Sequence, residues 1–252
     1  MALDLCFGCG DEGAALTPES FEDAYFEALE GVDYITNTLG NCPRANCMLN
    51  KLLKVKGANI CDVAKILDSS PNNNFGVKIG IGNLAPVNGI IPYGETTYQF
   101  GEAVVTLDIN RVCNEPNPLI IAETIMHELM HAFFYENMEA LGWNGKGSTQ
   151  TQYFDLLINN WMSASPGTTQ HEIMTEYYLE PMANTLWNLN NQLGQPSDYY
   201  GLILYGLNST VNGFNNVIAS KFNLTSQDIL NAYATSINVV VKPSTMNFTN
   251  CN

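Results

Sequence analysis

A short motif near the middle of the chain has the residue types and the spacing of a metal centre. It reads His127-Glu128-Leu129-Met130-His131. In a helix the two histidines lie one turn apart on the same face, where both imidazoles reach one metal ion. Glu128 lies beside them, where a carboxylate can take the proton of a metal-activated water. With three histidines in 252 residues, chance predicts on the order of 0.002 matches to HExxH. The spacing therefore predicts a catalytic zinc site for peptide-bond hydrolysis.

The third ligand has to come from a later part of the chain, because catalytic zinc sites commonly take three protein ligands and keep one position open. The remaining histidine, His171, lies 40 residues after His131, at the start of another expected helix. A helical hairpin would return it to the motif. Glu172 and Glu176 are the alternative third ligands, in a two-histidine, one-glutamate arrangement.

Two further features are expected to surround this centre. If His171 faces the metal, helical spacing carries Tyr178 along the same side, where its phenol is a candidate donor to the oxyanion of the tetrahedral intermediate. The alternative is that Tyr178 is an ordinary aromatic core residue. The strand expected at residues 103 to 109 precedes the metal helix and would flank the cleft, so that a sheet edge there aligns an extended peptide.

Hydrophobic periodicity and helix caps predict the elements that position these residues. The expected helices span residues 18 to 40, 45 to 56, 60 to 68, 118 to 141, 148 to 163, 168 to 193, 198 to 207, 211 to 222 and 225 to 236, and the expected strands span residues 75 to 81, 96 to 100, 103 to 109 and 237 to 241.

This order of elements favours one α+β domain over the whole chain, residues 1–252, because no linker interrupts it. We expect a helical N-terminal part at residues 1–74, then a small antiparallel or mixed sheet and the central HExxH helix at 75–145. The remaining part, 146–252, is expected to be mostly helical and to carry the third ligand.

The motif and the later run His171-Glu-Ile-Met-Thr-Glu-Tyr-Tyr178 resemble the SprT-like zinc metalloproteases, or zincins near them. The resemblance covers mainly residues 100 to 190. It implies a zincin-like fold, zinc held by His127, His131 and His171, and Glu128 as the general base. The interval before His171 is longer than in the best-known members. The DNA-repair roles of those members are not expected here, and the chain is more similar to exported, phage-borne or effector-type relatives.

Charge and hydropathy narrow the classes of partner. The formal net charge is −15, from 25 acidic and 10 basic residues. Such a chain has no electrostatic attraction for nucleic acid or for anionic membrane surfaces. No apolar run reaches 18 residues, so membrane insertion is not expected. A peptide or protein substrate is the expected partner, and the oligomeric state is not predicted.

The cysteine content points to an oxidising compartment, and hence to a secreted or exported protein. An odd number leaves at least one thiol without a partner in the chain. The alternatives are free thiols or a structural zinc held by Cys6, Cys9, Cys42 and Cys47. The seven cysteines are Cys6, Cys9, Cys42, Cys47, Cys61, Cys113 and Cys251.

Two other functions are compatible with the same residues. One is a zinc amidase that acts on cell-wall peptides. The other is a binding or assembly protein that contains a metal without catalysing a reaction. An intact Glu128 beside an open coordination position favours catalysis, because a structural site is usually closed by a fourth protein ligand.

Overall fold

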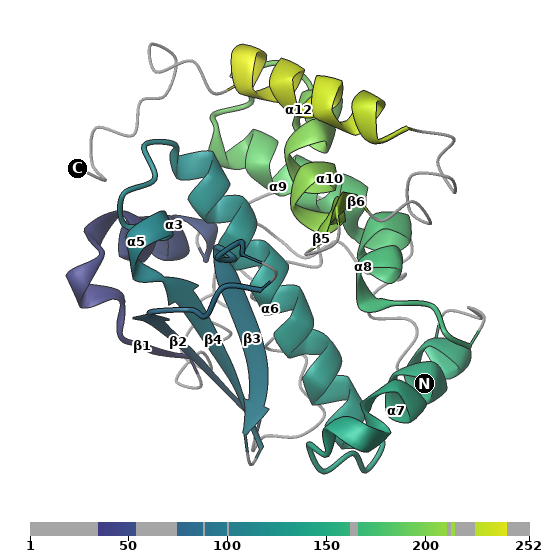
Figure 1. The fold of residues 1–252 in the computed structure, drawn as a ribbon. Coiled ribbons are helices and arrows are strands. Elements are labelled where there is room, and N and C mark those ends of the chain that lie inside the picture. The colour runs from purple at the N-terminus through teal and green to yellow at the C-terminus, as the bar shows by residue number, and fades with distance from the viewer. Residues whose placement is uncertain are drawn as a thin grey trace, which may run out of the picture.

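The long helix α6 (Pro118–Ala140) lies between a small sheet and a group of helices in the computed structural model (Figure 1). The structure describes residues 35–53, 75–87, 89–99, 101–161, 166–210, 213–214 and 225–240. In these ranges the chain is α+β, mostly helical, with one small mixed sheet, as the sequence predicts.

Four strands form that sheet, in the order β1-β2-β4-β3. β1 (Ile35–Asn37), β2 (Gly76–Gly82) and β4 (Glu102–Asp108) run parallel, and β3 (Gly94–Gln99) pairs antiparallel with β4. Alternate side chains of β2 and β4 are buried in the core that they share with α6, which is the period of two that a half-buried strand requires. They are Val77, Ile79, Ala103, Val105 and Leu107.

The sequence at both ends of α6 sets its length. The Asn117 side chain caps the helix by accepting a hydrogen bond from the Leu119 amide at 3.1 Å, and Pro118 occupies the first turn. Gly142 follows the helix with φ of +95°, a conformation that glycine adopts without strain. Most of the helix is buried on every side, including the polar residues Glu123 and Glu128.

The other elements surround α6. Helix α3 packs against it near the sheet, and α9 and α10 pack against it from the other side (Figure 1). Their bounds are α3 Pro43–Leu52, α5 Ile109–Val112, α7 Gly147–Trp161, α8 Gln170–Ile173, the π-helical segment Met174–Tyr178, α9 Leu179–Leu189, α10 Tyr200–Asn208, α12 Ser226–Val240, and a hairpin of β5 Ser209–Thr210 with β6 Gly213–Phe214. Short 3-10 turns lie at Leu39–Asn41 and Pro196–Tyr199.

Some predicted elements are wrong at their ends. Residues 35 to 37 were expected at the end of the first helix, but they form β1, because pairing with β2 provides backbone hydrogen bonds that outweigh the helical period. Of the final strand expected at 237 to 241, residues 237 to 240 form the last turn of α12, because Ile237 packs on the core, and residue 241 lies outside the described residues. Residues 213 and 214 form β6 within the range expected as the 211 to 222 helix.

The helix predicted at 60 to 68, and residues 18 to 34 of the first one, lie outside the described residues. The helices predicted at 45 to 56, 118 to 141 and 148 to 163 are confirmed as α3, α6 and α7 over the described residues, while residues 54–56 and 162–163 lie outside them.

A disulfide joins Cys42, just before α3, to Cys113, just after α5, across 71 residues of sequence. Cys47 is also disulfide-bonded. The predicted disulfide bonding is therefore confirmed for Cys42, Cys47 and Cys113. The other cysteines, Cys6, Cys9, Cys61 and Cys251, lie outside the described residues. Within the described ranges, no helix has both the length and the apolar character that crossing a membrane requires.

Candidate metal centre

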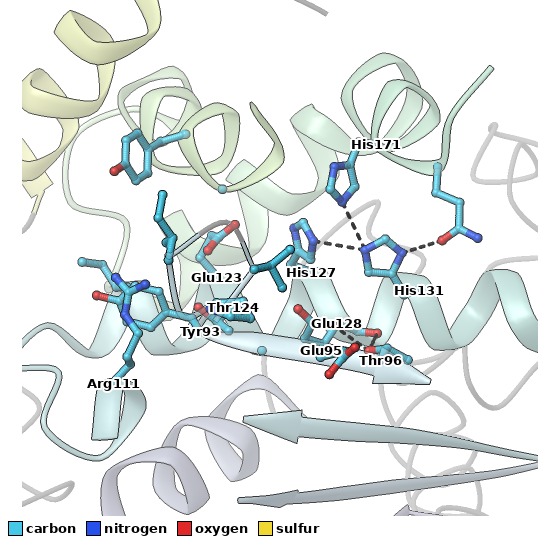
Figure 2. Close-up of a pocket in the computed structure, with 18 of the residues that line it drawn as sticks. Tyr93, Glu95, Thr96, Arg111, Glu123, Thr124, His127, Glu128, His131 and His171 are labelled. Carbon is cyan, nitrogen blue, oxygen red and sulfur yellow. Dashed lines mark hydrogen bonds between the residues drawn. The ribbon is translucent and has the colours of Figure 1, made fainter. Parts of the chain in front are cut away.

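Three imidazole rings converge on one point between α6 and α8 (Figure 2). The Nε2 atom of His131 lies 3.1 Å from Nε2 of His127 and 3.2 Å from Nε2 of His171. Two imidazole nitrogens bound to one tetrahedral zinc ion lie about 3.3 Å apart, given zinc–nitrogen bonds of 2.0–2.1 Å. The spacing of the three nitrogens fits such an ion, and these three histidines can hold a metal.

Hydrogen bonding among the rings does not account for this arrangement. His131 Nδ1 lies 2.5 Å from Oε1 of Gln170, which can only accept, so the proton of His131 belongs on Nδ1. Its Nε2 then has a single lone pair, and the Nε2 atoms of both His127 and His171 lie against it. A shared cation satisfies all three lone pairs at once, which hydrogen bonds between the rings cannot do.

Burial keeps the three rings neutral, which is the form that binds a metal. It lowers the pKa of His131 to about 3 and that of His127 well below the ordinary range, and it lowers the pKa of His171 as well. The neighbouring rings add to the effect for His127 and His131, because a second positive charge there is unfavourable.

A capping box at the start of α8 fixes the position of His171. The Glu172 amide donates to Oγ1 of Thr169 at 3.2 Å, and the Thr169 amide donates to Oε2 of Glu172 at 2.6 Å. The first turn that results carries Gln170 and His171 toward α6, and the backbone of Leu207 accepts a hydrogen bond from the His171 ring.

The alternative third ligands are placed elsewhere. The Glu172 carboxylate is engaged by the capping box, and the exposed Glu176 lies outside the pocket that the histidines line. Neither carboxylate belongs to the potential metal-binding group, which consists of His127, His131 and His171.

Glu128 is buried against strand β3 beside these histidines (Figure 2). Thr96 Oγ1 donates to Oε2 of Glu128 at 2.7 Å. Gly94 lets strand β3 lie close to the Glu128 side chain, because a Cβ at position 94 would lie 2.7 Å from Cγ of Glu128. Burial raises the pKa of Glu128 to about 7, partly opposed by the Thr96 hydrogen bond and assisted by Glu95. A carboxyl group with that pKa both accepts and returns protons near neutral pH.

Tyr178 does not lie where helical spacing predicts. It is buried in the core against Phe133 and Phe134, with ring centroids 6.4 and 6.3 Å away, and it does not line the pocket. The reason is the π-helical segment Met174–Tyr178, whose wider turns change the angular position of each later residue. The expected alignment of Tyr178 with His171 is therefore corrected.

Tyr135 lies in the pocket instead. Its phenol donates to the Thr96 carbonyl at 3.3 Å and accepts from Nε2 of Gln150 at 3.5 Å. Burial, and to a lesser degree Glu128 and Glu95, raise its pKa, so the phenol stays a proton donor at neutral pH.

A pocket of about 770 Å³ contains the histidines and extends along α6 toward α10 and α12 (Figure 2). Its sheet side is formed by β3 and not by β4, which was expected to flank the cleft. The reason is topological, because β4 is an inner strand and β3 is the edge strand.

Among the pocket residues on α6 that the sequence analysis did not predict are two with ionisable side chains, Glu123 and Tyr135. Both follow from the motif by helical spacing, because positions 123, 127, 131 and 135 differ by four residues and share one face of the helix. Extending the HExxH spacing by one turn in each direction would have found both.

Comparison with models of known families, with characterised proteins and with solved structures finds no match to this chain. Function is therefore inferred from the residues of the site itself.

Proposed function

We propose that the chain is a zinc-dependent metalloendopeptidase. The observation that carries the proposal is the convergence of three neutral imidazole nitrogens beside the buried carboxyl group of Glu128. His127, His131 and His171 would hold the ion. Imidazole ligands suit zinc, and three protein ligands leave a position for water. When bound, zinc lowers the pKa of water and polarises the scissile carbonyl.

The residues of the chain then have separate roles. Glu128, held by Thr96, takes a proton from the attacking water and returns it to the leaving amine. Tyr135 replaces Tyr178 as the candidate donor to the oxyanion of the tetrahedral intermediate, because its phenol reaches the pocket. The SprT-like resemblance and the zincin-like fold belong to this proposal.

Substrate alignment is proposed to use β3. It is the edge strand of the sheet and lines the pocket next to Glu128. An extended peptide added to this edge would form backbone hydrogen bonds that tolerate many sequences. The substrate class is therefore peptide or protein, and export of the chain remains part of the proposal.

The test combines metal analysis with a peptide-library cleavage assay on three proteins. The native chain should hold one zinc and cleave peptides, Glu128→Gln should hold zinc without cleaving, and His171→Ala should lose stoichiometric zinc. Undiminished cleavage by Glu128→Gln, or a tightly held zinc in His171→Ala, would reject the assignment. Zinc bound equally by the native chain and Glu128→Gln, with no cleavage by either, would favour a non-catalytic binding protein.

A further inference from the structure

One buried carboxyl group in the pocket is not used by the proposed mechanism. Glu123 lies on α6 one turn before His127, and Figure 2 shows the two side chains next to each other. It is 6% exposed and lines the pocket. Its Oε1 atom has no hydrogen-bond partner in the described parts of the chain. A buried carboxyl oxygen without a partner is costly to fold, which makes it a candidate for ligand recognition.

The backbone of α10 is shaped around this group. A Cβ at Gly206 would lie 2.2 Å from Oε1 of Glu123, so any larger residue would displace the carboxyl group. Glycine within a helix lowers helix stability relative to alanine by about 0.5–1 kcal/mol, so its presence here has a packing reason. The close approach of α10 holds Glu123 in place at the wall of the pocket.

The surroundings of Glu123 suit a positive charge on a long side chain. Tyr205 and Tyr233 stack on each other at this end of the pocket, with ring centroids 4.1 Å apart. Aromatic faces attract cations and also pack against methylene groups. Glu95 and Glu128 line the same pocket and add negative potential.

Arg111 is the one basic residue of the described chain, apart from histidine, that lines this pocket, and it is engaged elsewhere. Its guanidinium lies 3.8 Å from the centroid of the Tyr93 ring and donates a hydrogen bond to the Ile91 carbonyl. No ion pair between Arg111 and Glu123 is present, although both residues are described. Among the described residues, none therefore supplies the cation that Glu123 could bind.

We propose that Glu123 is a specificity-determining residue that binds the ammonium or guanidinium group of a lysine or arginine side chain near the scissile bond. This inference rests on the proposed peptidase function. Glu123 precedes His127 by four helical positions, a rise of about 6 Å along the helix axis. That places the carboxyl group within reach of a long side chain on a residue next to the cleaved bond, while β3 holds the peptide backbone.

The experiment measures binding and cleavage separately. N-acetyl-lysine methylamide and N-acetyl-norleucine methylamide differ only by the terminal ammonium group. Their Kd values are measured by chemical-shift titration on the full chain, with and without a chelator. We expect the native protein to bind the lysine compound at least tenfold more tightly, and Glu123→Gln to lose that preference. Equal Kd values on the native protein, or a preference that survives in Glu123→Gln, would overturn the proposal.

Two further variants separate recognition from general electrostatics and from misfolding. Glu95→Gln removes a charge from the same pocket at an exposed position, so it should keep the preference. An equal loss in Glu95→Gln would assign the effect to the overall potential and reject the specific role of Glu123. Glu123→Asp keeps a carboxyl group and should retain part of the preference, whereas a preference as low as that of Glu123→Gln would also count against the proposal.

Cleavage of peptide pairs with lysine or norleucine beside the scissile bond completes the test. The native chain should show a kcat/KM at least tenfold higher for the lysine peptide, and Glu123→Gln should not. If no peptide is cleaved while the binding preference persists, the proposed function fails and the cation subsite stands. If peptides are cleaved without any basic preference and the binding constants are equal, the subsite fails and the peptidase stands.

Discussion

Two adjacent turns of α6 face the same pocket, and the buried carboxyl groups of Glu128 and Glu123 differ in what surrounds them. In the turn from His127 to His131, Glu128 is held by Thr96, and His131 is held by Gln170. In the turn that begins at Glu123, the Oε1 atom of Glu123 has no hydrogen-bond partner within the described ranges. The two carboxyl groups are similarly buried, with Glu123 6% and Glu128 5% exposed.

The burial of a polar side chain and its hydrogen-bond partners together indicate what the side chain does. A buried group whose orientation is fixed by its neighbours is preorganised to bind a metal or a substrate. The His131 ring is fixed in this way by the side-chain amide of Gln170. A buried group without a partner imposes a free-energy cost on folding that a ligand can relieve. The first pattern is expected at a metal centre, and the second is expected where a substrate side chain is recognised.

Apart from the metal ligands and Glu128, the largest effect on catalysis is expected at Tyr135, one turn after His131 on α6. In Tyr135→Phe the loss of a preorganised donor should lower kcat about 100-fold, while zinc affinity stays unchanged. Tyr178→Phe is the matched control, because Tyr178 packs in the core against Phe133 and Phe134. Its kcat should stay within about twofold of the native value. Steady-state kinetics on both variants is the measurement. A larger loss of kcat in Tyr178→Phe than in Tyr135→Phe would favour Tyr178 as the oxyanion donor.

A smaller effect is expected one layer outside the ligands, at Gln170. Its Oε1 lies 2.5 Å from Nδ1 of His131 and fixes the tautomer that presents Nε2. Removing such a partner typically lowers metal affinity 10- to 100-fold. Gln170→Ala should show that loss in a competition titration with a chromophoric chelator, and Gln170→Glu should not. Gln150→Ala serves as the control, because Gln150 contacts Tyr135 and no ligand. Equal affinities in Gln170→Ala and the native chain would show that the ring needs no such support.

The metal centre is the part of this molecule that the sequence predicts best. HExxH spacing depends only on helical geometry, and α6 is long, capped and apolar, so His127, Glu128 and His131 were placed correctly on one helix. His171 was predicted as the third ligand because a catalytic zinc site usually has three protein ligands and His171 is the one other histidine of the sequence.

Predictions that assumed an unbroken helical period or an edge position were wrong. Tyr178 is the last residue of a π-helical segment, and no residue type in the run from 174 to 178 predicts that segment. The order of strands is set by pairing between distant segments, so the sequence did not reveal that β4 is internal and β3 is the edge. The absence of a partner at Glu123 depends on α10 and α12, which approach from more than 70 residues away in sequence.

The cost of burying Glu123 can be tested through the stability of the folded chain, even without a ligand. Burial, assisted by Glu128, raises the pKa of Glu123 from 4.5 to about 8 in the folded chain. Below pH 4.5 the group is protonated in both the folded and the unfolded chain. As the pH rises toward 8, the unfolded chain releases this proton while the folded chain keeps it. The stability that Glu123 contributes at low pH is therefore lost as the pH rises through that window.

Glu123→Gln does not titrate, so its stability should not show this loss. We expect the Tm of the variant to rise relative to native protein by about 2 to 8 °C between pH 4.5 and pH 8.5, which corresponds to about 1–2 kcal/mol. Glu128 and His127 from the same helix, Tyr205 and Tyr233 from α10 and α12, and Arg111 across the pocket are present in both proteins. Their titration cancels in the difference except for the coupling of Glu128 and Tyr233 to Glu123. Differential scanning calorimetry across this pH range is the measurement. A difference in Tm that does not change with pH would mean that Glu123 ionises as freely in the folded chain as in water, and the contrast between the two turns of α6 would then disappear.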